Sequence, residues 1–150
     1  KKVSYDPGIW FNSAKFFEIE YQVYGSVLAK APDHHQSIYW EHEGGRKSIR
    51  VIYDKNTEEI LGFNLMGVRF RHEVCEKWII QKTHIEEVLQ NLGLANFDPE
   101  FFKRHETEVI ESFNKSFPQL AVSITKKKKK NFSRRSIKRN RNKKNLIKWI

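Results

Sequence analysis

The chain has 150 residues, of which 39% are hydrophobic and 13% aromatic, enough for one domain with a buried core. Its formal net charge of +10 is uneven, because thirteen Lys and Arg and no acidic residue fall in 126–150, leaving fifteen basic and eighteen acidic residues in 1–125. Cys75 is the only cysteine, which excludes an internal disulfide and a cysteine-rich metal site, and no apolar run is long enough to span a bilayer.

The first part of the chain predicts strands. Residues 5–11 are expected to be irregular, because a Pro-Gly pair interrupts them. Apolar and polar residues then alternate from Phe17 to Val23, which is the clearest strand pattern in the chain. A polar loop leads to a short strand over 37–42, and Glu43-Gly44-Gly45-Arg46 supplies the next turn.

A β-hairpin is predicted between Ile49 and Met66, since both arms alternate with period two. Asp54-Lys55-Asn56-Thr57 separates the arms and fits a tight turn. Asp can accept hydrogen bonds from its own backbone, and Asn tolerates a left-handed conformation. We therefore expect four antiparallel strands in a meander.

Helices are predicted after Gly67, where the apolar period changes from two to about 3.6. One helix is expected over about 71–81, and Thr83 with Glu86 forms the pattern of a capping box at the start of a second. Asp98-Pro99 is the expected start of a third helix. Strands followed by helices predict an α+β fold, an antiparallel sheet of about four strands with about three helices mostly on one face.

The predicted hairpin and helix also carry a family resemblance. The run V-I-Y-D-K-N-T-E-E-I-L-G-F-N-L-M-G, followed directly by a helix, resembles the C-terminal, dimerisation-type domain of FAD-dependent pyridine-nucleotide oxidoreductases. Residues 10–25, W-F-N-S-A-K-F-F-E-I-E-Y-Q-V-Y-G, are similar, with one residue inserted, to the first strand of that domain in the ferredoxin-reductase and apoptosis-inducing-factor branches. The resemblance covers about residues 5–115.

The resemblance implies a C-terminal interface domain that lines a flavin pocket and is not catalytic alone. FAD and NAD(P)H would be held mainly by preceding domains absent from this chain, and those domains are the expected partners, with a homodimer in one branch and a monomer in another. The flavin-proximal residues implied are Trp10, Asn12, Ser13 and Lys15, and an aromatic plug between domains is the equal alternative for this segment. The His-Pro of the disulfide-reductase branch is missing near 96–99, which favours the other branches.

The sequence contains no motif of a complete nucleotide-binding, metal or cysteine-dependent active site. Neither G-x-G-x-x-G nor a G-K-S/T loop occurs, so the chain has no dinucleotide or triphosphate cradle of its own. His34, His35 and His42 are interpreted as surface residues rather than metal ligands, and no metal is expected. Cys75 lies on the apolar stripe of the first helix and is interpreted as a buried small hydrophobic residue.

The sequence divides into a leading segment (1–15), the reductase-like domain (16–118) and a basic tail (119–150) expected to be disordered in isolation. Beside a plain solvated charge run, the tail suits either of two polyanions, an anionic membrane with Trp149 at the interface or nucleic acid. The residues do not choose between the two, and the resemblance to a flavoenzyme favours the membrane. The expected location is cytoplasmic, with peripheral contact at the inner face of the membrane. The residues assigned to polyanion contact are Lys126, Lys127, Lys128, Lys129, Lys130, Arg134, Arg135, Lys138, Arg139, Arg141 and Trp149.

A second hypothesis is a stand-alone scaffold whose polybasic tail binds nucleic acid or an anionic membrane. Tyr39, Trp40 and Tyr53 would then be available for base stacking on the sheet. The acidic balance of 1–125 counts against a sheet that binds nucleic acid.

Overall fold

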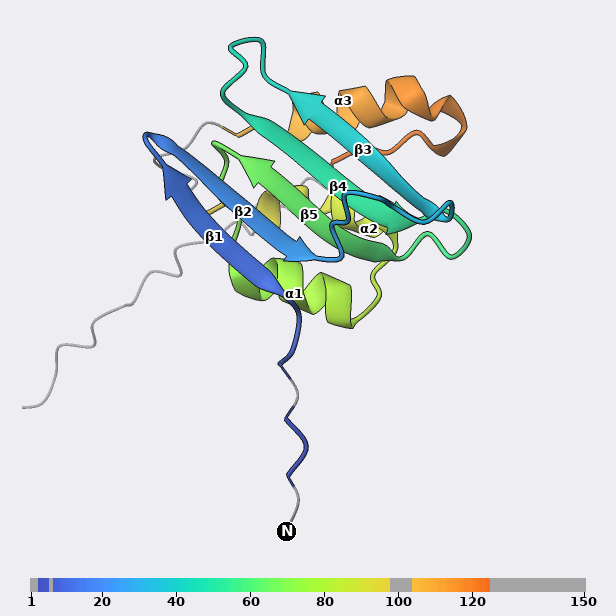
Figure 1. Cartoon of the computed structure of the whole chain (residues 1–150). Coiled ribbons are helices and arrows are strands. Elements are labelled where there is room, and N and C mark those ends of the chain that lie inside the picture. The colour runs from blue at the N-terminus through green and yellow to red at the C-terminus, as the bar shows by residue number, and fades with distance from the viewer. Residues whose placement is uncertain (1–2, 6, 98–103, 125–150) are drawn as a thin grey trace, which may run out of the picture.

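A computed structural model describes residues 3–5, 7–97 and 104–124. The fold is α+β, as predicted: a five-stranded antiparallel sheet carries its helices on one face (Figure 1). The strands are β1 (Phe11–Phe16), β2 (Ile19–Gly25), β3 (His35–Glu41), β4 (Ser48–Asp54) and β5 (Ile60–Met66). The helices are α1 (His72–Ile80), α2 (Ile85–Gln90) and α3 (Glu106–Ser116), with short 3₁₀ turns at Leu92–Leu94 and Pro118–Leu120.

β1 is the strand that the sequence did not predict, and it raises the count from about four to five. Phe11 to Phe16 pair with β2 from Tyr24 back to Ile19. The strand predicted from Phe17 to Val23 is β2, and its predicted start is wrong. Phe17 lies in the two-residue turn between β1 and β2, with φ of 55°. The alternating segment therefore begins two residues later, and the aromatic residues before it form an edge strand.

The strand order is β1-β2-β5-β4-β3, so the predicted simple meander is wrong. β2 pairs with β5 rather than with β3, and the segment after β2 passes across the ends of β5 and β4 before reaching β3 (Figure 1). Two glycines paired across the strands, Gly25 and Gly62, allow this crossing. A Cβ on Gly62 would lie 2.5 Å from the Tyr24 carbonyl oxygen and 3.0 Å from the Ser26 nitrogen.

The β4–β5 hairpin is confirmed, and Asp54 closes its turn as expected. The Asp54 Oδ1 accepts hydrogen bonds from the backbone N–H of Asn56 (2.8 Å) and of Thr57 (3.3 Å). The left-handed residue is Glu58, with φ of 59°, and not Asn56. Glu58 holds this conformation because its N–H donates to the Asp54 carbonyl (2.7 Å) and its own carbonyl accepts from Ile85 of α2 (2.8 Å).

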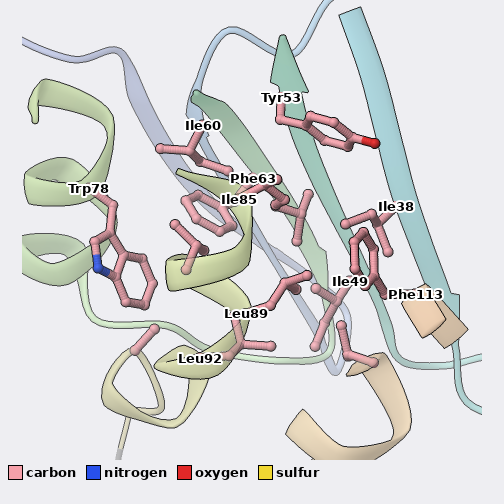
Figure 2. Packing of buried hydrophobic residues seen from close by; sticks show 14 of the residues in the cluster. Ile38, Ile49, Tyr53, Ile60, Phe63, Trp78, Ile85, Leu89, Leu92 and Phe113 are labelled. Atoms are coloured by element: carbon pink, nitrogen blue, oxygen red, sulfur yellow. The ribbon is translucent and has the colours of Figure 1, made fainter. Parts of the chain in front are cut away.

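One contiguous hydrophobic core lies between the sheet and the helices. Figure 2 shows Phe63 and Ile49 of the central strands facing Leu89 of α2, Trp78 of α1 and Phe113 of α3. Phe63, Leu89 and Phe113 are fully buried. The helices therefore hold the sheet through side chains from all its central strands, which places the hydrophobic driving force on this one face.

β2 presents its apolar side chains away from that core. Its buried residues are Gln22 and Tyr24, whereas Ile19, Tyr21 and Val23 are only half-buried. Tyr24 pairs with Phe63 of the core face, and Val23 pairs with Asn64 on the opposite face. The sheet thus has an outward face with an apolar stripe along β2.

The helices occur in the predicted order. The predicted cap of the second helix is wrong, and the predicted start of the third helix lies outside the described residues. α1 matches its predicted range and buries Cys75 and Trp78. The predicted capping box at Thr83 is wrong: the residue before α2 is His84, and no side chain caps the helix. Thr83 instead uses its backbone, accepting from Ile60 and donating to Trp78, both at 2.9 Å. The predicted third start at Asp98-Pro99 lies outside the described residues.

α3 and the segment after it complete the helical layer. Val109, Ile110 and Phe113 are its buried residues, and they pack over β3. After the helix the chain turns back, and the side-chain amide of Asn114 both accepts from and donates to the backbone of Val122, at 2.8 and 3.0 Å. Val122 is buried, so the folded part extends at least that far.

Candidate functional site

Trp10, the first of the flavin-proximal residues that the resemblance implies, lines a hollow at one end of the sheet. The hollow measures about 460 Å³ and lies where the leading segment, the end of β2, the start of β5 and the end of α1 meet. Trp10 is 59% exposed, so a large part of its indole is free to contact another group. The apolar residues that line the hollow are Ile9, Trp10, Ile60, Leu61 and Ile79.

Backbone hydrogen bonds hold the hollow in place. The N–H of Gly25 donates to the Trp10 carbonyl at 2.8 Å, and the N–H of Ser26 donates to the Leu61 carbonyl at 2.9 Å. Gly25 has φ of 66°, and a Cβ there would lie 2.3 Å from the Leu61 oxygen and 2.9 Å from Ile79 Cδ1. Glycine is required here both for its conformation and for the close approach of the strands.

One ion pair stands at the rim of the hollow. Lys82 Nζ lies 3.4 Å from Glu59 Oε2, and both residues line the hollow. Among the described residues, the lining contains no nucleophile paired with a base. The mainly apolar lining, with one exposed indole, is suited to contact with an apolar group.

The other three residues that the resemblance places near a flavin, Asn12, Ser13 and Lys15, lie on β1 and do not line the hollow with Trp10. Ser13 and Lys15 pair with Gln22 and Glu20, on the helix-bearing face, whereas Asn12 pairs with Val23 on the outward face. The Ser13 hydroxyl donates to Glu20 Oε1 at 3.4 Å. At a strand rise of about 3.4 Å per residue, Lys15 lies about 17 Å along the chain from Trp10. Trp10 alone of the four lines the hollow.

An aromatic stack beside the hollow was not predicted from the sequence. The ring of Phe11 stacks on Tyr24 with centroids 4.8 Å apart and contacts His72 at 4.5 Å. The Tyr24 hydroxyl donates to the Phe70 carbonyl at 3.1 Å, and burial raises the Tyr24 pKa well above its ordinary value of 10. The three residues lie far apart in the sequence, so the stack could be predicted only from the β1–β2 pairing and the packing of α1 against β2.

A second hollow of about 530 Å³, lined by acidic residues, lies between β3 and α3. Its carboxylates are Glu41, Glu43, Glu108 and Glu111. The adjacent His105 is buried, its Nδ1 lies 3.1 Å from Glu108 Oε2, and its ring packs on Trp40 at 4.7 Å. In the part of the chain that the structure describes, no three His, Cys, Asp or Glu side chains are placed to hold one metal ion.

The remaining sequence candidates stay apart in the structure. His34 and His35 lie at the start of β3 and His42 beyond its end, more than about 20 Å away at the rise of a strand. They cannot share one ion. Cys75 is fully buried, and burial raises its pKa far above that of a free thiol, which confirms the interpretation of an inert core residue.

The polyanion-contact residues assigned in the tail, from Lys126 to Trp149, lie outside the described residues. Across the ranges 3–5, 7–97 and 104–124, no helix is long and apolar enough to cross a membrane.

Comparison with known proteins gives a similarity of fold. No protein-family model matches the chain, and no curated protein matches it in sequence. Among solved structures, the fold is similar to part of an NAD-dependent persulfide reductase from A. fulgidus, with 16% identity and a TM-score of 0.53. The match covers 77% of this chain and 24% of that one, so the chain corresponds to about a quarter of the reductase.

Proposed function

We propose that this chain is the C-terminal α+β domain of an FAD-dependent NAD(P)H oxidoreductase. The observation that supports the proposal is that the fold of this chain is similar, over 77% of its length, to part of an NAD-dependent persulfide reductase. The hairpin and helix on which the family resemblance rests are β4, β5 and α1 of that fold. The bounds 16–118 expected from the sequence leave out β1, which pairs with β2, and the buried Val122, so we propose that the domain spans residues 11–122. A leading segment precedes it and the basic tail follows it.

The residues of the chain fit contact with a flavin edge and not the binding of a whole dinucleotide. The hollow offers one large exposed indole, apolar walls and the ammonium of Lys82 at its rim. The sequence contains no glycine-rich phosphate loop, so the pyrophosphate of FAD or NAD(P)H would be held by other domains.

A bound flavin would supply the acceptor for a hydride from a nicotinamide, and both cofactors would be held mainly by other domains. The role of this chain is to supply a wall: Trp10 covers the cofactor edge, and the apolar lining excludes water from it. The pairing of Gly25 with Trp10 and Gly62 keeps that wall at a fixed position relative to the sheet. The chain alone is expected to have no turnover.

The test is the visible absorption spectrum of the protein made from its longest natural reading frame, recorded anaerobically before and after NADH. Flavin bands bleached by NADH are the expected result, and the isolated 150-residue chain is the control that should be colourless. A colourless full-length protein, indifferent to NADH, would refute the proposal.

The partners proposed are the preceding FAD- and NAD(P)H-binding domains and a second copy of the chain.

We also propose that the tail binds an anionic membrane, because its thirteen positive charges are attracted by acidic lipid at about 1 kcal/mol per residue near the surface. Co-sedimentation with anionic vesicles at low and high salt tests that contact, which salt should weaken.

A further inference from the structure

The tip of the β1–β2 hairpin carries two exposed phenylalanines. Phe17 is 99% exposed and Phe16 is 61% exposed. Phe16 pairs with Ile19, so Phe17 and Glu18 alone form the turn. The hairpin forms one corner of the molecule, at the far end of the β1 edge strand (Figure 1).

The backbone at this tip disfavours the residue that occupies it. Phe17 has φ of 55°, in the left-handed region that Gly and Asn adopt readily and that residues with a bulky side chain avoid. Its ring makes no compensating contact with the core, because it is almost wholly in solvent. Folding therefore gains nothing from a phenylalanine at this position, which indicates that the ring serves an interaction.

The apolar surface continues from the tip onto the outward face of the sheet. The ring of Phe16 meets that of Tyr21 edge-on, with centroids 5.7 Å apart. Ile19 and Met66 lie on the same face, since Phe16 pairs with Ile19 and Tyr21 pairs with Met66. We call the tip and this continuation, Phe16, Phe17, Ile19 and Tyr21, the aromatic hairpin surface.

We propose that the aromatic hairpin surface inserts into an anionic lipid bilayer and is a second membrane contact of the chain, in addition to the contact proposed for the basic tail. The proposal rests on the proposed membrane contact of that tail. A bilayer accepts a protruding apolar tip without a matching pocket, whereas a folded partner would need one. A single lipid anchor binds a membrane only marginally, and a polybasic patch is one signal that makes the attachment stable. By the same logic, the hairpin supplies an apolar contact and the tail supplies the basic one.

Charges around the tip fit this division of roles. Lys15 and Glu18 flank the two phenylalanines, and Glu20 behind them is paired with Arg69 at 3.3 Å. The hairpin is therefore close to neutral. Electrostatic attraction must come from the tail, while the hairpin contributes burial of apolar surface.

The experiment measures partition of the full 150-residue chain onto vesicles of phosphatidylserine and phosphatidylcholine. Full burial of a Phe ring corresponds to at least about a tenfold change in partition, so F17S should lower binding about tenfold and F16S/F17S more. L28S is the matched control, because Leu28 is also exposed (54%) but follows the opposite end of β2, about 24 Å away. Its binding should equal that of the native chain.

F17G separates a binding role from a folding role. Glycine relieves the left-handed strain, so this variant should have a higher Tm than the native chain and yet bind vesicles about tenfold more weakly. Native-like vesicle binding by F17G and F17S would overturn the proposal. A shift in sedimenting mass of F16S/F17S with unchanged vesicle binding would overturn it too, because the surface would then be a protein contact.

Glutamine substitution of Lys126 to Lys130 tests the tail separately. If the glutamine variant binds vesicles more weakly but the Phe16 and Phe17 variants bind like the native chain, the tail contact is supported and the hairpin contact is refuted. No vesicle binding by the native chain at low salt would refute both contacts. Neither result depends on a flavin, so the oxidoreductase proposal is tested independently by the absorption spectrum.

Discussion

Tyr24 and Phe70, 46 residues apart in the sequence, are joined by a hydrogen bond of 3.1 Å from the tyrosine hydroxyl to the phenylalanine carbonyl. Gln22 Oε1 accepts from the Phe70 N–H (2.9 Å) and lies 3.2 Å from the Tyr24 hydroxyl, whose single proton is shared between Gln22 Oε1 and the Phe70 carbonyl. All three residues are buried. This small polar network connects β2 to the chain entering α1 at the place where β2 has polar groups instead of apolar ones on its inner face.

Removing the Tyr24 hydroxyl should destabilise the fold. Y24F leaves a buried carbonyl with one donor fewer, which costs about 1–3 kcal/mol in the free energy of unfolding. Urea denaturation of the native chain and of Y24F measures the difference. Y39F is the control, because the Tyr39 side chain is exposed and its hydroxyl donates to the exposed Glu41. Equal midpoints for Y24F and the native chain would contradict the structural role of the network.

Alkaline pH should weaken the native fold more than the Y24F variant. Burial raises the Tyr24 pKa above its unfolded value of about 10, so the folded state keeps a proton that the unfolded chain releases. Stability from this group is complete below about pH 10 and is lost as the pH rises further. Urea midpoints at pH 8 and pH 11 check this. Some slope should remain in Y24F, because burial also raises the Tyr53 pKa.

A methyl group at Gly62 should disrupt the crossing after β2. In G62A the new Cβ would lie 2.5 Å from the Tyr24 carbonyl oxygen, so the backbone must shift, at a cost of about 2 kcal/mol or more. G44A is the matched control: its nearest neighbour is the flexible His42 side chain at 3.4 Å, and its stability should change by less than about 0.5 kcal/mol. Equal loss in both variants would refute the argument from close approach.

Acid should reveal the role of Asp54 in its turn. The backbone N–H of Asn56 holds the Asp54 pKa below its usual value, so the stabilisation is present above the unfolded pKa of about 3.9 and is lost as the pH falls towards the folded value. D54A should have a lower Tm than the native chain at pH 6, with the gap narrowing at pH 3. D54N keeps the acceptor without its charge, so its difference from D54A should stay constant with pH.

Trp10 should quench the flavin in the proposed full-length enzyme. If its indole lies at the flavin edge, W10A in the longest reading frame should raise flavin fluorescence and shift the visible bands. Y39A, at the opposite edge of the sheet, should leave the fluorescence and the bands unchanged. Identical fluorescence in W10A and the native enzyme would remove Trp10 from the flavin site while leaving the fold assignment intact.

The β4–β5 hairpin and the first helix could be predicted from the sequence because their signals are local. Alternation from Ile49 to Met66 and the 3.6-residue period after Gly67 depend only on near neighbours in the chain. The candidate site could be predicted only in part. Resemblance indicated Trp10, but the hollow beside it needs Leu61 and Ile79 from elements that the sequence does not place next to it.

The sequence by itself determined the strands other than β1 and the first helices, that the cysteine has no disulfide partner within the chain and that the positive charge lies in the tail. Only the tertiary structure decided that β2 pairs with β5 and that Phe11 to Phe16 join the sheet. It also decided that Ile19 and Tyr21 face outward while Gln22 and Tyr24 face the core. The physical reason is that alternation separates two faces of a strand, whereas the choice of the face that is buried depends on which distant residues pack or hydrogen-bond against it.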